Sequence, residues 1–227
     1  MTKKIKVVTL GDHPLSPSGV GTQTRYVCEA LLKSGKFEIF SLGGAIKHKD
    51  YSMKKVEEYG DDWRILPVDG YGTPEVIRSL LRNEKPDILW VMTDPRFYEW
   101  LWLMENEVRP LCPIVYYHVW DNYPYPVFNK KFYDSNDYIA TISKVTDDIV
   151  RNVSPDVSCT YIPHAVKGDI FVSKSVEERR QLREQSLHEL DRDKFIVFWN
   201  NRNARRKQSG TLVWWWKEWL DKRGLIL

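Results

Sequence analysis

The sequence predicts an α/β fold built around a parallel sheet. Short apolar runs bounded by turn residues recur along the chain, as is typical of buried parallel strands. Segments with apolar residues at helical spacing lie between these runs, and several begin with capping residues. Strands that alternate with helices in this way are joined by right-handed crossovers. We find no internal repeat beyond this alternation and no low-complexity tract.

Length and composition limit the class of protein. A chain of 227 residues with 42% hydrophobic content can bury a sizeable core and corresponds to one domain, or to one domain and part of another. The formal net charge of +3, from 34 basic and 31 acidic residues, does not indicate a nucleic-acid partner. The ten Trp and twelve Tyr suit an aromatic-rich core, the usual location of large aromatic side chains, or a protein that binds carbohydrate.

The cysteines and the apolar runs bear on location and on metals. Cys28, Cys112 and Cys159 are far apart and lack ligand spacing, so we interpret them as thiols of a reducing compartment. The acidic residues are scattered along the chain, so we expect no metal and no cofactor. No apolar run approaches the roughly 18 residues of a membrane span, and the N-terminal run is too short for a signal peptide. We therefore expect a cytoplasmic protein without a membrane span.

The N-terminal segment predicts a strand, a glycine-containing loop and a helix. Residues 5–10 form the strand, the turn-rich residues 11–21 cannot continue it, and a helix begins near Gly21 and ends around residue 34. Gly19 and Gly21 let backbone N–H groups approach a ligand beside the positive end of that helix, which favours a phosphate or a sugar. A dinucleotide site fits less well because the glycines follow the strand too late. A purely structural loop is the other interpretation.

The middle of the chain continues the alternation. Thr73, Pro74 and Glu75 provide an N-cap, a proline at the first helical position and an acid in the first turn of a helix. Residues 48–62 are polar and are interpreted as a surface excursion. The remaining elements expected here are strands at 37–42, 63–68 and 88–92 and a helix at 97–108.

Polar residues follow two of the predicted strands. Asp94 comes after the strand at 88–92, at the edge where open α/β sheets bind ligands, although an Asp there is equally common as an N-cap. The strand at 113–117 leads into His118, followed by Asp121, Asn122 and Tyr123. These polar and aromatic residues form the most site-like loop of the first half. The alternative is a proline-stiffened connector with an ordinary hydrogen-bonded histidine.

The last third of the chain contains a junction between two α/β segments. A strand at 137–143 and a helix capped by Ser143 precede a strand that ends in Ile162, Pro163 and His164. A charged helical connector covers residues 173–192. The expected elements beyond it are a strand at 195–201, a basic run at 202–207 and a helix at 208–223.

Two residues of the basic run carry a specific chemistry. Arg202 offers a rigid fork for two phosphate oxygens, and Lys207 offers a compact point charge. Cations held beside a leaving diphosphate stabilise the charge that grows on it in the transition state. The alternative is a solvated basic loop.

The junction and the basic run resemble family 4 glycosyltransferases of the GT-B type. In that family a strand ending in Ile-Pro-(Asn/His)-Gly-Val-Asp leaves the first domain, and the second domain opens with a strand, Gly-Arg and a Lys five residues after the Arg. This chain keeps Arg202 and Lys207 at that spacing. It departs from the pattern at Ala165, Lys167 and Asn201. Its other matches at the junction are Ile162, Pro163, His164, Val166 and Phe171.

The resemblance implies a GT-B fold whose N-terminal domain is a Rossmann-like parallel sheet and whose second Rossmann-like domain is truncated. The expected boundaries are an acceptor-side domain at 1–172, a helical linker at 173–193, and the first strand and helix of a donor-binding domain at 194–227. The implied activity is metal-independent transfer of a sugar from a nucleotide sugar to an acceptor hydroxyl, with retention of configuration.

The resemblance also implies roles for individual residues. His118 is expected to contact the transferred sugar, and Arg202 and Lys207 to hold the donor phosphates. Gly19 and Gly21 are expected to border the donor phosphate or the acceptor. The expected contacts of the acceptor or sugar are Asp94, Asp121, Asn122, Tyr123 and His164.

Alternatives to a complete transferase remain open. The family's Glu-x(7)-Glu motif belongs to the second domain, of which residues 194–227 would be only the start. We therefore expect weak or no activity from this chain alone, unless a missing C-terminal domain or a second chain completes it. A nucleotide-sugar epimerase of the same fold and a non-catalytic glycan-binding or partner-binding domain are the competing interpretations. The residue types do not identify the donor sugar or the acceptor.

Overall fold

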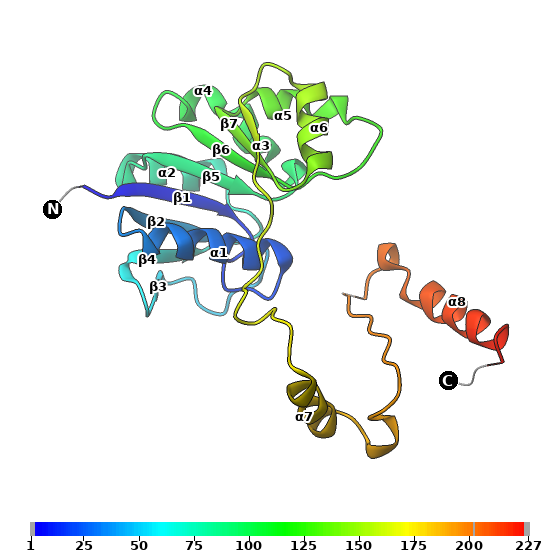
Figure 1. Cartoon of the computed structure of the whole chain (residues 1–227). Helices are drawn as coiled ribbons and strands as arrows, with labels where there is room; N and C mark the ends of the chain where they lie inside the picture. The colour runs from blue at the N-terminus through cyan, green and yellow to red at the C-terminus, as the bar shows by residue number, and fades with distance from the viewer. Residues whose placement is uncertain (1–2, 202, 225–227) are drawn as a thin grey trace. The chain divides into compact units, whose positions relative to one another are not determined.

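The structure is a computed structural model that describes residues 3–201 and 203–224 (Figure 1). Its contacts divide the chain into two compact units, Met1–Lys167 and Gly168–Leu227. The first unit contains the sheet and the helices that cover it. Each unit is described by itself.

An eight-stranded sheet forms the centre of the first unit. Its strand order is β3-β4-β2-β1-β5-β6-β7-β8, and each pairing is parallel except that of β3 with β4. Apart from the edge strand β3, this is the doubly wound order of a Rossmann-like sheet. The predicted α/β fold with a parallel sheet is confirmed. The strands are β1 (Ile5–Gly11), β2 (Phe37–Gly43), β3 (Lys54–Val56), β4 (Gly60–Pro67), β5 (Ile88–Met92), β6 (Ile114–His118), β7 (Tyr138–Thr141) and β8 (Cys159–Tyr161).

Helices lie on both faces of this sheet (Figure 1). Helix α1 packs Cys28 and Leu32 into one hydrophobic cluster, together with Trp63 and Trp90 from the strands. The other helices pack into a larger cluster on the opposite face. They are α2 (Pro74–Glu84), α3 (Glu99–Leu103), α4 (Glu105–Val108), α5 (Lys130–Asp134) and α6 (Lys144–Val153), whereas α1 covers Gly19–Lys33. Short 3-10 turns are η1 (Pro95–Tyr98) and η2 (Val127–Asn129).

Helix α2 shows how the local sequence determines an element. The Thr73 side chain accepts a hydrogen bond from the Val76 N–H, and Pro74 occupies the first helical turn, as predicted. Ile77 and Leu80 on one face of the helix are buried against the sheet. Lys85 adopts a left-handed conformation with φ of 48° and ends the helix.

Three predicted elements of the first unit differ from the structure. The polar stretch at 48–62 contains β3, which pairs antiparallel with β4 at the edge of the sheet, where polar residues are tolerated. The helix predicted at 97–108 is divided into η1, α3 and α4. Met104 interrupts it with non-helical torsion angles, and Leu103 points into solvent. Helix α1 begins at Gly19 because Ser18 caps it.

The second unit consists of helices and extended segments. Helix α7 (Val176–Ser186) begins with a capping box in which Ser175 and Glu178 exchange hydrogen bonds, and α8 covers Ser209–Asp221. Short 3-10 turns η3 (Glu189–Asp191) and η4 (Arg205–Lys207) lie between them. The strand predicted at 195–201 does not form, because a strand requires a pairing partner and residues 195–201 have none in the structure. Phe195 is 91% exposed as a result.

The aromatic residues divide between the two units. Trp63, Tyr98 and Tyr116 are fully buried in the first unit, in agreement with the core interpretation of the composition. Trp214 and Trp215 on α8 are exposed. No helix within the described residues is long and apolar enough to cross a lipid bilayer.

Candidate functional site

The order of the strands in the sheet reverses between β1 and β5, which is a topological switch point. From β1 the chain continues to β2 on one side, and it returns through α2 to β5 on the other side of β1. The loops that leave the carboxyl ends of β1 and β5 therefore diverge, and open α/β sheets bind ligands in the crevice at such a point. Residues 12–18 and 93–96 form these two loops, which we call the switch-point site.

Asp12 lies at the centre of the loop after β1. The Ser18 hydroxyl donates a hydrogen bond to its carboxylate over 2.6 Å and accepts one from the Gly21 N–H over 2.9 Å. The Thr22 N–H is bonded to the Ser18 carbonyl. A negative charge therefore already lies near the positive end of α1, and the N–H groups of Gly21 and Thr22 are engaged.

The two glycines of this loop have different environments. A Cβ atom on Gly21 would lie 2.5 Å from the Ser16 Oγ and 2.6 Å from the His13 carbonyl oxygen, so Gly21 allows the loop to pack against α1. A Cβ atom on Gly19 would meet nothing within 4 Å. Gly21 thus has a packing role, whereas Gly19 faces open space. Their predicted contact with a ligand stays a prediction.

A pair of stacked aromatic rings adjoins Asp12. The rings of Tyr71 and Phe97 are 4.6 Å apart with an angle of 13° between their planes, and the Tyr71 hydroxyl donates a hydrogen bond to Asp12 over 3.2 Å. Burial, aided by the charge of Asp12, raises the pKa of Tyr71 to about 12, so the hydroxyl keeps its proton. Phe97 is 49% exposed. The arrangement presents an accessible aromatic face beside a carboxylate.

Sequence reasoning did not identify these three residues. Asp12 lies in a turn-rich loop whose predicted role rested on its glycines. Tyr71 and Phe97 come from two segments that only the fold brings together. The general rule that ligands bind at the carboxyl edge of the sheet was the one sequence signal available.

Asp94 occupies the loop after β5, where it was predicted, and caps a short turn. Its carboxylate accepts hydrogen bonds from the Arg96 N–H over 3.0 Å and from the Arg96 guanidinium over 2.9 and 2.6 Å. Burial acts to raise the pKa of Asp94, but the hydrogen bonds from Arg96 outweigh it and the pKa lies below its usual value. The Arg96 guanidinium also lies 5.5 Å from the centre of the Trp120 ring. Asp94 is thus ionised and paired.

His118, at the end of β6, has no exposed surface in this structure. Its Nε2 lies 2.7 Å from the Tyr133 hydroxyl, and its Nδ1 has no partner among the described residues. Burial lowers the pKa of His118 to about 3, with a small opposing effect of Asp94, so the imidazole is neutral. Its predicted contact with a sugar stays a prediction.

The loop after His118 places its polar residues apart. Asp121 and Asn122 are exposed, and the Asn122 carbonyl accepts a hydrogen bond from the Trp120 indole. The Tyr123 hydroxyl donates to Asp148 on α6 over 3.0 Å, as the Tyr125 hydroxyl does over 2.9 Å. The structure does not join these residues into one cluster with His118.

His164 lies on the other face of the sheet from His118. Its ring packs edge-on against Tyr117 at 5.4 Å, and successive side chains of a strand point to opposite faces. The Tyr117 hydroxyl donates to the Ile162 carbonyl, which fixes the segment that leaves β8. Burial lowers the pKa of His164. The two histidines are therefore not brought together.

The predicted phosphate ligands belong to the second unit. Arg202 lies outside the described residues, and Lys207 ends the 3-10 turn η4, where its N–H is bonded to the Ala204 carbonyl. Their predicted role stays a prediction. Residues 3–201 and 203–224 contain no group of three or more His, Cys, Asp or Glu side chains that could hold a metal ion.

Comparisons with known proteins give distant structural likenesses. No protein-family model and no curated protein matches the chain. A solved structure described as trehalose-6-phosphate from E. coli bound with UDP-2-fluoro glucose has a TM-score of 0.48 and 11% identity, covering 79% of this chain and 54% of that one. An α,α-trehalose 6-phosphate synthase from Burkholderia multivorans has a TM-score of 0.43 and 14% identity, covering 81% and 52%. This chain thus spans about half the length of these structures, and the likeness assigns neither family nor activity.

Proposed function

We propose that the chain belongs to a glycosyltransferase that moves a sugar from a nucleotide sugar to an acceptor hydroxyl, and that the first unit holds the acceptor at the switch-point site. The observation that carries this proposal is the stacked pair of Tyr71 and Phe97 beside the carboxylate of Asp12. The sequence resemblance at the junction, including Pro163 and His164, supports it independently.

The chemistry of the switch-point site suits a carbohydrate. A sugar ring has an apolar face of C–H groups that packs on an aromatic ring, and Phe97 offers such a ring to solvent. Sugar hydroxyls are hydrogen-bond donors, and an ionised carboxylate is a pure acceptor with several lone pairs. Asp12 uses two of these positions for Ser18 and Tyr71, and it has capacity for more.

The charge at this site favours a neutral acceptor over a diphosphate. Asp12 and Asp94 are acidic, and Arg96 is committed to Asp94 by three hydrogen bonds. A diphosphate is held by cations, and a basic run lies in the second unit at 202–207. We therefore assign Gly19 to the border of the acceptor, and the donor phosphates to the cations of the second unit. Metal-independent transfer with retention of configuration is part of this proposal and follows from the resemblance.

A binding experiment with two variants tests the acceptor assignment. Asp12→Asn and Phe97→Ala should each weaken binding of a neutral monosaccharide or disaccharide by about tenfold, because each loses a charge-assisted hydrogen bond or an aromatic contact. The measurement is calorimetric titration of the full chain against a panel of sugars.

The matched control is Asp156→Asn, an exposed carboxylate in the loop between α6 and β8. It should leave sugar binding unchanged. Equal affinities in Asp12→Asn, Phe97→Ala and the wild type would remove the acceptor from the switch-point site.

An assay of donor consumption separates transfer from its competitors. A transferase consumes the nucleotide sugar in the presence of a bound acceptor, whereas an epimerase converts it without one. A non-catalytic domain binds the sugar and leaves the donor intact. Conversion of the donor that does not depend on any acceptor would contradict the proposal of sugar transfer.

A further inference from the structure

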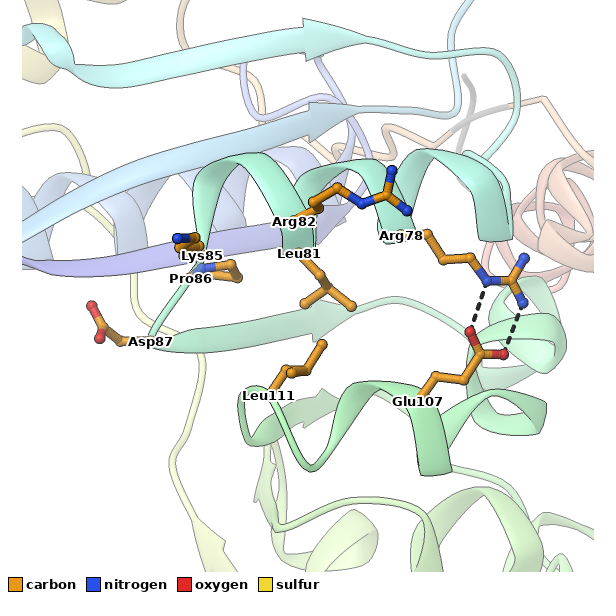
Figure 2. Close-up of a pocket in the computed structure, with 8 residues that line it drawn as sticks. All are labelled: Arg78, Leu81, Arg82, Lys85, Pro86, Asp87, Glu107 and Leu111. Atoms are coloured by element: carbon orange, nitrogen blue, oxygen red, sulfur yellow. Dashed lines mark hydrogen bonds and ion pairs between the residues drawn. The ribbon is translucent and has the colours of Figure 1, made fainter.

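A groove between helices α2 and α4 of the first unit has features of a ligand site separate from the switch-point site. It lies between α2 and the segment from α4 to Leu111, and its cavity volume is about 720 Å³ (Figure 2). Pockets for small molecules typically have volumes of about 300–1,000 Å³. The lining residues are Arg78, Leu81, Arg82, Lys85, Pro86, Asp87, Glu107 and Leu111. We call this cavity the α2–α4 groove.

The groove is separate from the switch-point site. Asp87 immediately precedes β5, whereas Asp94 follows the carboxyl end of the same strand. The two sites therefore lie at opposite ends of β5, a strand that is about 16 Å long. A ligand of the groove would not take part in the proposed sugar transfer.

The centre of the groove is apolar. Leu81 and Leu111 point toward each other across it from the two sides, and Pro86 closes one end (Figure 2). Leu111 is 66% exposed, which leaves a large apolar side chain accessible at the rim. Leu81 and Pro86 are themselves buried and form the floor of the groove, so the apolar surface that a ligand would remove from water is mainly that of Leu111. This surface favours a ligand with a small hydrocarbon part.

The acidic side chains of the groove are already neutralised. Glu107 accepts two hydrogen bonds from the Arg78 guanidinium, over 2.7 and 2.8 Å, at one end of the cavity (Figure 2). Asp87 accepts a hydrogen bond from the Lys6 N–H over 2.8 Å and pairs with Lys3. Neither carboxylate is therefore free to neutralise a further cation in the groove.

Two cations of the groove have no such partner. Arg82 and Lys85 are exposed, and neither makes an ion pair or a side-chain hydrogen bond within the described residues. Their neighbour Glu84 is bound to Lys6 and Arg64 instead. Both cations complement the negative end of α2, and together they leave the groove with a positive charge beside an apolar floor.

From this combination we propose that the α2–α4 groove binds a small soluble anion with an apolar body, such as an alkyl phosphate or carboxylate. The guanidinium of Arg82 and the ammonium of Lys85 lie on opposite sides of Leu81 (Figure 2), and each can attract the anionic group, while Leu111 contacts the hydrocarbon part above the floor of Leu81 and Pro86. The ligand requires both parts, because neither the exposed cations nor the small apolar surface holds a molecule well alone.

The test uses hexyl phosphate as the probe, with inorganic phosphate and 1-hexanol as the two half-ligands. Titration of the full chain, followed by amide chemical shifts in NMR spectra, should show saturable binding of hexyl phosphate with shifts at Leu81 and Leu111. Each half-ligand should bind at least about tenfold more weakly, since it lacks the charge-assisted contacts or the apolar contact.

Variants separate the groove from the rest of the surface. The double variant Arg82→Gln, Lys85→Gln and the single variant Leu111→Ser should each weaken hexyl phosphate binding by about tenfold. All three positions are exposed, so folding should be kept. The matched control Lys33→Gln, Lys36→Gln removes two exposed lysines at the end of α1 and should change the affinity by less than about twofold.

Three results would overturn the proposal. They are equal affinity in the charge variant and the wild type, binding of 1-hexanol as tight as that of hexyl phosphate, and shifts confined to residues outside the groove. A further experiment tests whether the anion belongs to a soluble molecule or to a membrane lipid. Cosedimentation with phosphatidic acid vesicles that is lost in the charge variant would place the phosphate on a membrane lipid and contradict the assignment to a soluble molecule.

Discussion

At the scale of single residues, His118 is a buried group whose protonation is opposed by its surroundings. Burial lowers its pKa to about 3 in the folded chain, whereas a histidine in the unfolded chain titrates near its ordinary value of about 6.5. Between these values the unfolded chain binds more protons, so the free energy of unfolding decreases as the pH falls through this window. The contribution of the neutral imidazole to stability is fully present above pH 6.5 or so.

This linkage gives a prediction for His118→Gln, which cannot bind a proton at this position. The wild type should be more stable at pH 7.5 or so, and its advantage should shrink by up to about 1.4 kcal/mol per pH unit below about pH 6.5. Urea unfolding of both proteins at several pH values measures the difference, in which the contributions of His13 and His164 cancel. An advantage that stays constant down to about pH 4.5 would mean that His118 is accessible to protons.

Gly19 and Gly21 form a matched pair for a second prediction. Gly21→Ala should decrease the free energy of unfolding by about 1–3 kcal/mol, because the new Cβ would collide with the His13 carbonyl and the Ser16 hydroxyl. Gly19→Ala should be neutral or slightly stabilising, because it meets open space and alanine favours a helix. Chemical denaturation measures both, and equal effects would contradict the packing role of Gly21.

At the scale of elements, the segment after β8 is attached to α1. The Gln23 side chain donates to the Ala165 carbonyl over 2.8 Å and accepts from the Ala165 N–H over 3.3 Å. Lys167 lies 3.6 Å from the carboxylate of Glu29 and 5.4 Å from the centre of the Tyr26 ring. The end of the first unit is thus fixed by side chains of a helix near its other end.

We predict that Gln23→Ala releases this segment without unfolding the unit. The Ala165 amide should exchange its hydrogen faster, because it loses its acceptor, while the free energy of unfolding changes by about 1 kcal/mol or less. Hydrogen exchange followed by NMR or mass spectrometry measures the effect. Gln181→Ala, on α7, is the control and should leave the exchange rate of the Ala165 amide unchanged. An unchanged rate in Gln23→Ala would show that the hydrogen bonds between Gln23 and Ala165 do not form in solution.

Local signals predicted some elements well and others not at all. Helices α2 and α6 have side-chain caps and apolar stripes, and both form where the sequence places them. The edge strand β3 escaped notice because its residues are polar and its pairing with β4 is not encoded locally. The strand at 195–201 was wrongly expected for the same reason, since apolar residues favour a strand only where a partner is present.

At the scale of the whole molecule, the sequence placed polar residues at the carboxyl edge of the sheet but did not predict which side chains meet there. Asp94 lies at this edge, as predicted, because it comes shortly after β5, and its role as a site residue stays a prediction. Tyr71 lies between β4 and α2, and Phe97 follows β5, so only the fold brings their rings together. His118 and His164 were expected in one site, but the alternation of side chains along β6 separates them.

The distribution of buried residues predicts that the first unit folds alone. Both hydrophobic clusters lie entirely within residues 1–167, as does the complete sheet. A domain with its own core is stable without its neighbours. The fragment of residues 1–167 should therefore unfold in one cooperative transition. Its urea midpoint should be close to the midpoint that Trp63 and Trp90 report for the first unit of the full chain.

Fluorescence of these buried tryptophans and far-ultraviolet circular dichroism measure the two proteins side by side. Trp63 and Trp90 move from a buried environment into water when the first unit unfolds, whereas the exposed tryptophans of α8 are already in water, so the shift of the emission maximum mainly reports unfolding of the first unit. The control is the fragment of residues 1–155, which lacks β8 and the segment clamped by Gln23 and should be clearly less stable. A large loss of stability on removing residues 168–227 would instead mean that the second unit completes the core of the first, because only buried apolar contacts supply free energies of that size.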